Sequence, residues 1–247
     1  MASTITTREI TYIAKDGTQL VGFFAAPTTQ KPIAGILVSP EWWGRNEYTE
    51  QRACELAEHG YAAFALDMYG DKKVTTSASQ AYEWMIQTFN DPNTLVTRSS
   101  AALETLAAQD EVNPNTLGAI GFCYGGKVIL DLARSGAPLQ AVVTFHANLS
   151  AQSPAQEGKI QAEILVLHGE LDSMVTLDDV ANFREEMCAA KVNHDVIVFE
   201  NAKHGFSNPL ADERAKANNV DLGYNAEAEK QGLEAMYELL DSYFKTK

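Results

Sequence analysis

Leu117-Gly-Ala-Ile-Gly-Phe-Cys-Tyr-Gly-Gly126 is the stretch of this chain that best predicts its fold. An apolar run typical of a buried strand leads into Gly121-Phe-Cys-Tyr-Gly125, and a helical pattern follows up to Arg134. Glycines on both sides of a nucleophile permit a strained strand-to-helix turn, because larger side chains there would collide with neighbouring backbone. The pattern therefore predicts that Cys123 is a nucleophile at the end of a strand. The other interpretation is a buried cysteine beside tightly packed glycines.

Strand-like and helix-like segments alternate on both sides of this turn. Short β-like runs at residues 8–13 and 19–25 flank Asp16-Gly17, which predicts a hairpin. Apolar strands are expected at residues 33–38, 61–66, 117–122, 141–145, 164–167 and 196–199. Helices are expected at residues 48–59, 77–89, 93–108, 124–134, 178–190 and 226–244. The alternation predicts a mostly parallel sheet with helices on both faces, and we expect residues 1–247 to form a single α/β domain.

Composition and charge exclude several classes of partner. The formal net charge is −14 and the sequence pI is about 4.7, which disfavours nucleic acid and anionic membrane surfaces as partners. No apolar run approaches the ~20 residues that cross a bilayer, and the first ten residues lack the pattern of a secretory signal. Three cysteines are too few for a disulfide framework, so we expect a reducing, cytoplasmic protein.

A thiol nucleophile needs a base, and histidine is the usual one. In hydrolases with this turn the chain order is nucleophile, acid, histidine, and the histidine follows the last strand. Of the five histidines, His204 in Asn201-Ala-Lys-His-Gly-Phe206 satisfies that order and leaves room for an acid before it. His146 and His168 each end a predicted strand on its carboxyl side, where either could also line a pocket.

The acid should come from the segment after the strand at 164–167. Four candidates lie there: Glu170, Asp172, Asp178 and Asp179. The last two fit the first turn of a helix, where carboxylates favour the macrodipole. Glu170 lies very close to the strand end, whereas Asp172 is spaced to reach from the loop back to an imidazole. We therefore predict Asp172 as the acid, the alternative being a solvated loop aspartate.

These motifs together resemble those of the dienelactone hydrolase family, a branch of the α/β-hydrolase fold. The motifs that match are Pro40-Glu-Trp-Trp-Gly44, Ala65-Leu-Asp-Met-Tyr-Gly70, Gly121-Phe-Cys-Tyr-Gly-Gly126, His168-Gly169 with Asp172, and His204-Gly-Phe206. The resemblance covers about residues 8–245. A cysteine in the turn together with a glutamate in the first loop is specific, since most α/β-hydrolases have serine there and lack that glutamate.

The resemblance assigns a role to each residue. It implies that Cys123 is the nucleophile, His204 the base and Asp172 the acid that orients it. Glu41 matches the carboxylate that contacts the resting cysteine and helps to activate it. The backbone N–H groups of Trp42 and Tyr124 match the oxyanion hole. His-Glu-x-x-His and Cys-x-x-Cys spacings are absent from the chain, so we expect neither a metal nor another cofactor.

One departure from the family pattern bears on the substrate. The archetypal members hold a substrate carboxylate with arginines, one of them shortly after the catalytic histidine, but Gly205-Phe-Ser-Asn-Pro209 contains none. We therefore expect a small neutral ester or lactone, bound beside aromatic residues such as Trp42, Trp43, Trp84 or Phe206. Two alternatives stay open: promiscuous hydrolysis of phosphotriesters by the same residues, and a non-catalytic binding protein with this fold.

Overall fold

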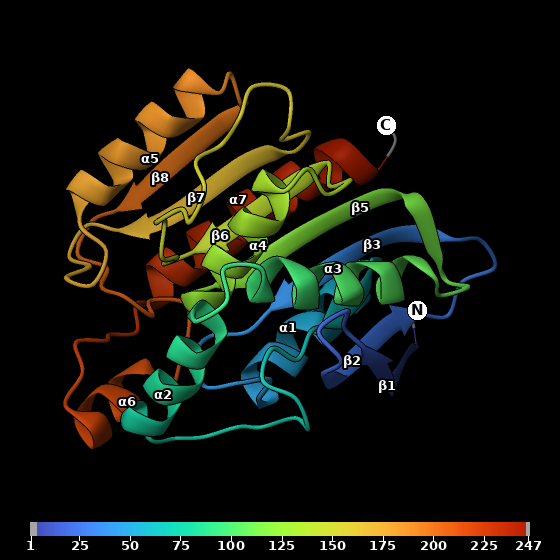
Figure 1. Ribbon diagram of the computed structural model, residues 1–247, viewed down its shortest axis with the longest axis horizontal. Coiled ribbons are helices and arrows are strands. Elements are labelled where there is room, and N and C mark those ends of the chain that lie inside the picture. The colour runs from blue at the N-terminus through green and yellow to red at the C-terminus, as the bar shows by residue number, and fades with distance from the viewer. Residues whose placement is uncertain (1–3, 246–247) are drawn as a thin grey trace.

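A sheet of eight strands forms the centre of the computed structural model, which describes residues 4–245 (Figure 1). The strand order is β1-β2-β4-β3-β5-β6-β7-β8. An antiparallel hairpin of β1 (Ile5–Ile13) and β2 (Gln19–Pro27) joins the sheet by antiparallel pairing with β4 (Ala62–Ala65). β4 and β5 (Val112–Phe122) both pair in parallel with β3 (Ile33–Ser39), and β6 (Ala141–Phe145), β7 (Glu163–Gly169) and β8 (His194–Phe199) continue the parallel part of the sheet. The predicted mostly parallel sheet with its N-terminal hairpin is confirmed.

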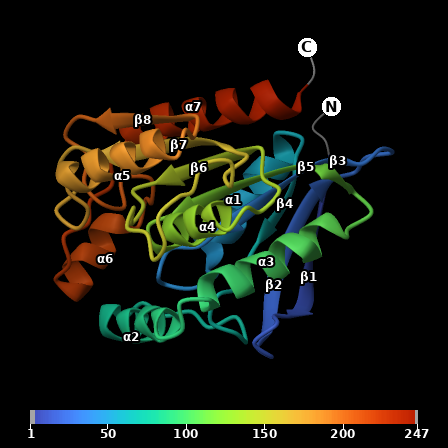
Figure 2. The same ribbon diagram turned by 45° about the horizontal axis from the view of Figure 1, so that its top comes forward.

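Helices cover both faces of the sheet (Figures 1 and 2). On one face lie α1 (Glu47–Glu58) and α7 (Ala226–Phe244), and on the other lie α3 (Thr94–Ala107), α4 (Tyr124–Arg134) and α5 (Leu177–Ala189). Side chains alternate between the faces along each strand. In β3, Ile36 and Val38 pack into the core under α1 and α7, whereas Leu37 packs into the core under α3 and α4. This two-sided burial explains why β3 is apolar throughout.

Two helices stand away from the faces, at the carboxyl ends of the strands. They are α2 (Ala78–Phe89) and α6 (Ala211–Asn218), and they lie side by side in both ribbon views (Figures 1 and 2). The Asn218 side chain links them, since its Oδ1 accepts from the Ala78 N–H at 2.7 Å and its Nδ2 donates to the Thr76 carbonyl at 3.0 Å. α6 was not among the predicted helices, because its non-polar residues are all alanines and it buries only Ala211.

The remaining predicted elements agree with the structure, with shifts at their ends. The largest shift is in β5, which begins at Val112 rather than near Leu117, because the polar residues at its start hide its pattern. Gly17 has φ of +83°, as the hairpin turn requires. Between residues 4 and 245, no helix combines the length and the apolar composition that crossing a membrane requires.

Candidate active site

Cys123 lies at the junction of β5 and α4 in a strained backbone conformation. Its φ is +54°, which is uncommon for a residue with a side chain. The flanking glycines make the turn possible. A Cβ atom at Gly121 would overlap the carbonyl oxygen of Gly125, and one at Gly125 would overlap the carbonyl oxygens of Ser39 and Pro40. The close approach of three backbone segments is therefore the physical reason for the glycine pattern in the sequence.

Asp172 and His204 meet from two different loops. Asp172 Oδ2 lies 2.7 Å from His204 Nδ1, and both residues are buried. The other carboxylate oxygen accepts hydrogen bonds from the backbone N–H groups of Met174 and Val175, each at 2.9 Å, which fixes the carboxylate. The backbone of Asp172 follows directly from β7, and His204 follows β8, so parallel neighbouring strands bring the two loops together.

The other acids considered from the sequence are engaged elsewhere. The Glu170 carboxylate accepts from the Asn201 N–H at 3.2 Å, and Asp179 completes a capping box with Thr176 at the start of α5. Asp178 lies in the same first helical turn. Among these four acids, Asp172 is the one in hydrogen-bond contact with His204.

The electrostatics of His204 depend on Cys123 and Asp172. Burial by itself would lower the pKa of His204, but the interactions of the imidazole with Cys123 and Asp172 outweigh it. The pKa of His204 is therefore raised well above its ordinary value. Nε2 of His204 makes no well-formed hydrogen bond with the described residues, which leaves this atom free on the side of Cys123 and the pocket. The imidazole is placed to exchange a proton with a group bound there.

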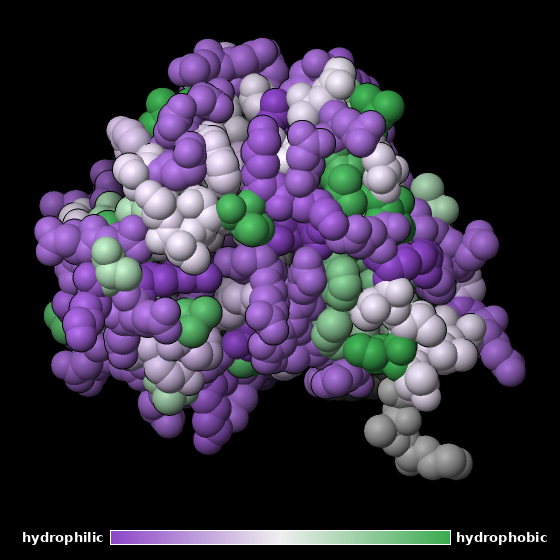
Figure 3. Space-filling model, turned by 90° about the horizontal axis from the view of Figure 1, so that it is seen from below, coloured by the Kyte–Doolittle hydropathy of each residue, from purple (hydrophilic) through white to green (hydrophobic). Residues whose placement is uncertain are grey.

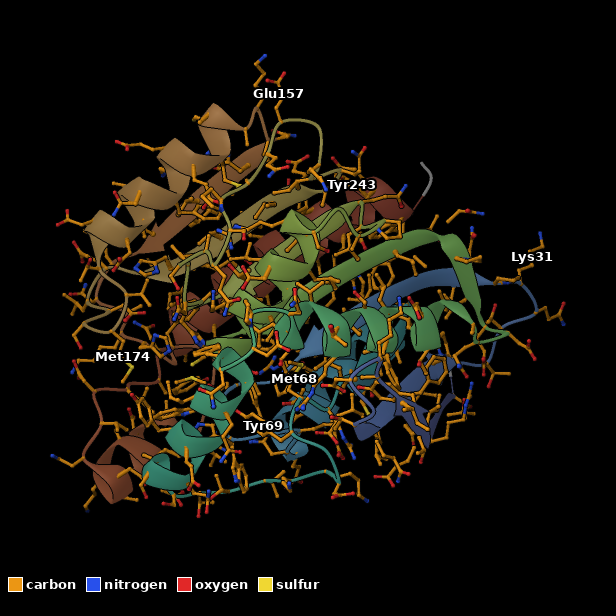
Figure 4. All side chains as sticks on the ribbon, viewed as in Figure 1. Lys31, Met68, Tyr69, Glu157, Met174 and Tyr243 are labelled. Carbon is orange, nitrogen blue, oxygen red and sulfur yellow. The ribbon has the colours of Figure 1, made fainter. Side chains whose placement is uncertain are left out.

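A pocket of about 250 Å³ opens beside Cys123 and His204. Its wall is mostly apolar and is built from separate loops and helices, among them Tyr82 and Met85 from α2, Met174 from the loop before α5, and Leu222 after α6. Met174 is labelled in Figure 4, on the side of that loop facing α2 and α6. The full lining is Glu41, Trp42, Trp43, Tyr82, Met85, Cys123, Tyr124, Asn148, Met174, Val175, His204 and Leu222.

The backbone N–H groups of Trp42 and Tyr124 are among those at this pocket that have no hydrogen-bond partner in the described part of the chain. The N–H of Tyr124 is in the first turn of α4, where no carbonyl is available within the helix. The phenol hydroxyl of Tyr69, a residue labelled in Figure 4, donates a hydrogen bond to the Trp42 carbonyl at 3.0 Å and holds the loop that carries Trp42. Free N–H donors beside a thiol are suited to bind an oxyanion.

Glu41 is buried and lies in the wall of the same pocket as Cys123, and its side chain is hydrogen-bonded to Asn208 and Arg214. Its Oε2 accepts from Asn208 Nδ2 at 2.6 Å and from Arg214 Nη1 at 3.0 Å. Burial raises the pKa of Glu41 above its ordinary value, although Arg214, Asn208 and His204 each act to lower it. The Arg214 guanidinium also lies over the Trp43 ring, 5.0 Å from its centroid. Arg214 belongs to the unpredicted α6.

Asn148 is a pocket residue that the sequence analysis missed. Its backbone N–H donates to the Cys123 carbonyl at 3.2 Å, and its Oδ1 accepts from the backbone and hydroxyl of Ser150 at 3.0 and 2.7 Å. With Oδ1 engaged, the Nδ2 donor remains for a pocket ligand. Its position just after β6 was the available signal, because polar residues at strand carboxyl ends often reach a site.

Other residues singled out from the sequence lie outside the pocket lining. Phe206 is fully buried between Phe145 and Phe199 and is a core residue. His146 and His168 are both fully buried behind the pocket. Cys54 is half-buried on α1, and Cys188 is exposed on α5. Within residues 4–245, no three His, Cys, Asp or Glu side chains are grouped as a metal site would need.

Comparison with known proteins gives consistent matches. The model of the dienelactone hydrolase family matches residues 20–244. A solved dienelactone hydrolase-like promiscuous phosphotriesterase from metagenomic libraries is 36% identical, with a TM-score of 0.91 over 97% of this chain and 99% of that one. A relative from Escherichia coli O157:H7, provisionally named a carboxymethylenebutenolidase, is 26% identical over 94% of this chain and 86% of its own. A Bradyrhizobium protein named as a probable 2-oxo-3-(5-oxofuran-2-ylidene)propanoate lactonase is 24% identical over 81% of this chain and 84% of its own.

Proposed function

Because the chain belongs to the dienelactone hydrolase family and is a hydrolase of the α/β-hydrolase fold, we propose that it cleaves small, uncharged esters or lactones through a Cys123 acyl-enzyme. One observation carries the proposal. Cys123 and His204 face the same apolar pocket, and the Asp172 carboxylate holds the far side of the imidazole at 2.7 Å. A nucleophile, a base and an orienting acid are the groups that acyl transfer requires.

The chemistry proceeds in two stages. His204 Nε2 accepts the thiol proton as the Cys123 sulfur attacks the carbonyl carbon, and the N–H groups of Trp42 and Tyr124 stabilise the oxyanion. Collapse of the tetrahedral intermediate breaks the carbon–oxygen bond, and the protonated His204 gives its proton to the departing alkoxide. Water then attacks the thioester with His204 as base, the carbon–sulfur bond breaks, and the acid is released with the free thiol.

The pocket favours an uncharged substrate. Its described lining contains neither lysine nor arginine. The nearby Arg214 is paired with Glu41, so it is not free to bind a substrate carboxylate. Apolar side chains such as Tyr82, Met85 and Met174 instead suit an aryl or alkyl group.

The test is to trap the acyl-enzyme by rapid quenching with an activated aryl ester and to measure the intact mass. We expect one acyl adduct, localised to Cys123 by peptide mapping, and no turnover by a folded Cys123→Ala variant. Cys54→Ala and Cys188→Ala are the matched controls and should form the adduct at the wild-type rate. Turnover near the wild-type level by Cys123→Ala would overturn the assignment of the nucleophile.

A second activity is favoured by one specific comparison: the relative with a TM-score of 0.91 is described as a promiscuous phosphotriesterase. We infer that this chain also hydrolyses neutral aryl phosphotriesters. The Cys123 sulfur would bond to phosphorus as the aryloxide leaves, and the phosphoryl oxygen would gain charge at the same two N–H groups. Water must then break the sulfur–phosphorus bond, which is easier than with serine because a thiolate is the better leaving group.

The rate of the second step distinguishes this activity from simple inhibition. We expect steady release of the aryloxide by the wild-type enzyme and a stalled phosphoryl adduct in Cys123→Ser. A single burst without turnover by the wild-type enzyme would refute the phosphotriesterase activity and leave the ester hydrolase proposal intact.

A further inference from the structure

Behind His204, three buried side chains form a chain of hydrogen bonds that the proposed reaction does not use. His146 Nε2 lies 2.9 Å from Ser207 Oγ, and Ser207 Oγ lies 2.9 Å from the Tyr48 phenol oxygen. The Tyr48 hydroxyl also donates to the Ser207 backbone carbonyl at 3.0 Å. Tyr48 lies on α1, His146 directly follows β6, and Ser207 lies in the turn after His204; each is buried. The turn is therefore tied to two distant elements of the fold.

The direction of the hydrogen bonds can be derived from counting protons. The Tyr48 hydroxyl has one hydrogen, and it is used on the Ser207 carbonyl. Ser207 Oγ–H is then free to donate to the Tyr48 oxygen, and His146 Nε2–H donates to Ser207 Oγ. This arrangement leaves His146 Nδ1 as an acceptor without a partner, as observed. The other tautomer would leave a buried N–H without a partner, which costs more. His146 is thus neutral with its proton on Nε2.

Burial agrees with a neutral His146. Removal from water lowers its pKa well below the ordinary value, and the charge on His204 acts in the same direction. The His146 ring meets the His204 ring edge-on, with centroids 5.2 Å apart. His146 also has φ of +40°, a strained backbone conformation that persists only where the surroundings fix it. The ring is therefore held against the back of His204.

The turn that these hydrogen bonds hold in place connects two parts of the site. At one end is His204, facing Cys123, and at the other is Asn208, which donates to Glu41 at 2.6 Å. Ser207 lies between them and is anchored through both its side chain and its carbonyl. A movement of this turn would shift the base and the Glu41 carboxylate together.

We propose that His146, Ser207 and Tyr48 are positioning residues that hold the turn at residues 204–208, so that His204 faces Cys123 while Asn208 holds Glu41. The inference rests on the proposed function for its catalytic meaning. The position of His204 that these residues maintain can be measured without any substrate.

The measurement is the titration of His204 by long-range ¹H–¹⁵N NMR, which is practical because the chain has five histidines. The charged and titratable groups around this imidazole are Cys123 from the β5–α4 turn, Asp172 after β7, Glu41 after β3, His146 directly after β6 and His168 on β7. If the turn loosens, contact with Cys123 and Asp172 weakens, and the pKa of His204 should fall.

Tyr48→Phe and Ser207→Ala each remove one hydroxyl from the chain. The matched controls are Tyr61→Phe, which removes a phenol hydroxyl bonded to Asp241 at the amino end of β4, and Ser99→Ala, which removes a buried hydroxyl bonded within α3. We expect the pKa of His204 to fall by about one unit in the two test variants, the shift that corresponds to about 1.4 kcal/mol. For ester hydrolysis we expect kcat to fall by about tenfold with little change in KM.

Three outcomes decide the inference. If Tyr48→Phe and Ser207→Ala lower the melting temperature but leave the His204 titration unchanged, these hydrogen bonds stabilise the fold without positioning His204, and the proposal is overturned. A wild-type spectrum showing the His146 proton on Nδ1 would overturn the assigned direction. A fall in the pKa of His204 in an enzyme that forms no acyl adduct would support the positioning role while the proposed function failed. Tyr48→Phe keeps the ring and its packing on Phe122, so this variant stays testable if Ser207→Ala does not fold.

Discussion

The contact between Asp172 and His204 is the residue-scale feature with the clearest chemical consequence. Asp172→Asn removes the negative charge that raises the pKa of His204, so the pKa should fall. We expect kcat to fall by about 10³- to 10⁴-fold, as loss of an orienting carboxylate does in proteases, and His204→Ala to lose more. Ester hydrolysis followed from pH 5 to 9 measures both effects. Glu170→Gln is the control, and a larger loss there than in Asp172→Asn would show that the acid is misassigned.

The pair of Glu41 and Arg214 sets the charge next to the pocket. In Glu41→Gln the guanidinium loses its ionic partner at 3.0 Å but remains stacked on Trp43, a pocket residue. We expect the ratio of kcat/KM for an ester with a free carboxylate to kcat/KM for its neutral methyl ester to rise about tenfold, which is about 1.4 kcal/mol. The ratio is the useful quantity, because loss of Glu41 lowers both rates. The double variant Glu41→Gln/Arg214→Gln should return the ratio to its starting value, and a ratio that stays high in it would exclude Arg214 as the cause.

His168 makes stability depend on pH. Burial lowers its pKa in the folded chain, partly offset by Asp172, and neither ring nitrogen has a hydrogen-bond partner among the described residues. Below about pH 6.5 the unfolded chain therefore binds more protons than the folded one, and stability falls as the pH drops. His168→Leu should reduce that loss. Urea unfolding at pH 7, 6 and 5 measures it, and a slope equal to that of the wild type would contradict the argument.

At the scale of elements, the junction of β5 and α4 tolerates no extra atom. Gly125→Ala places a Cβ against the carbonyl oxygens of Ser39 and Pro40, so β3 or α4 must shift. We expect a loss of more than about 3 kcal/mol in the free energy of unfolding, together with loss of hydrolysis. Gly223→Ala is the matched control, because its Cβ meets only the flexible side chain of Lys203. Equal stability of the two variants, measured by urea unfolding, would be inconsistent with the crowding described at this turn.

How far the sequence predicts each element depends on whether the cause is local. The turn at Cys123 could be predicted because the glycines that its crowded backbone requires form a short, recognisable sequence pattern, although part of the crowding comes from Ser39 and Pro40. The apolar strands could be predicted because burial on both faces requires apolar side chains. α6 could not be predicted, since a polar helix with one buried residue has no periodic signal. Arg214 was missed as a partner of Glu41 because it lies on this unpredicted helix and because 173 residues separate the two in the chain. The orientation of Glu41 toward Asn208 depends on that tertiary contact.

At the scale of the whole molecule, the net charge of −14 surrounds the pocket with a repulsive field for anions. Seen from below, most of the surface is hydrophilic, with hydrophobic residues in separate spots (Figure 3). We expect kcat/KM for a carboxylate-bearing ester to rise with salt while that of its neutral methyl ester stays constant, because at 0.1 M salt charges are screened beyond about 10 Å. Stopped-flow rates from 10 to 500 mM NaCl provide the test. Equal salt dependence for the two esters would rule out long-range repulsion.

The crowding of backbone around Cys123 also bears on how this protein can acquire new substrates. Substitutions at Gly121, Gly125 or Gly126 are blocked by neighbouring main chain or by Ala147, so the reacting end of the pocket is almost invariant under mutation. The opposite wall is assembled from side chains of α2, the loop before α5 and the segment after α6, of which Tyr82 and Met174 are exposed. Variation there changes the fit of a ligand without disturbing the backbone around Cys123. Adaptation of this enzyme, in nature or in a directed library, should therefore concentrate at Tyr82, Met85, Met174 and Leu222.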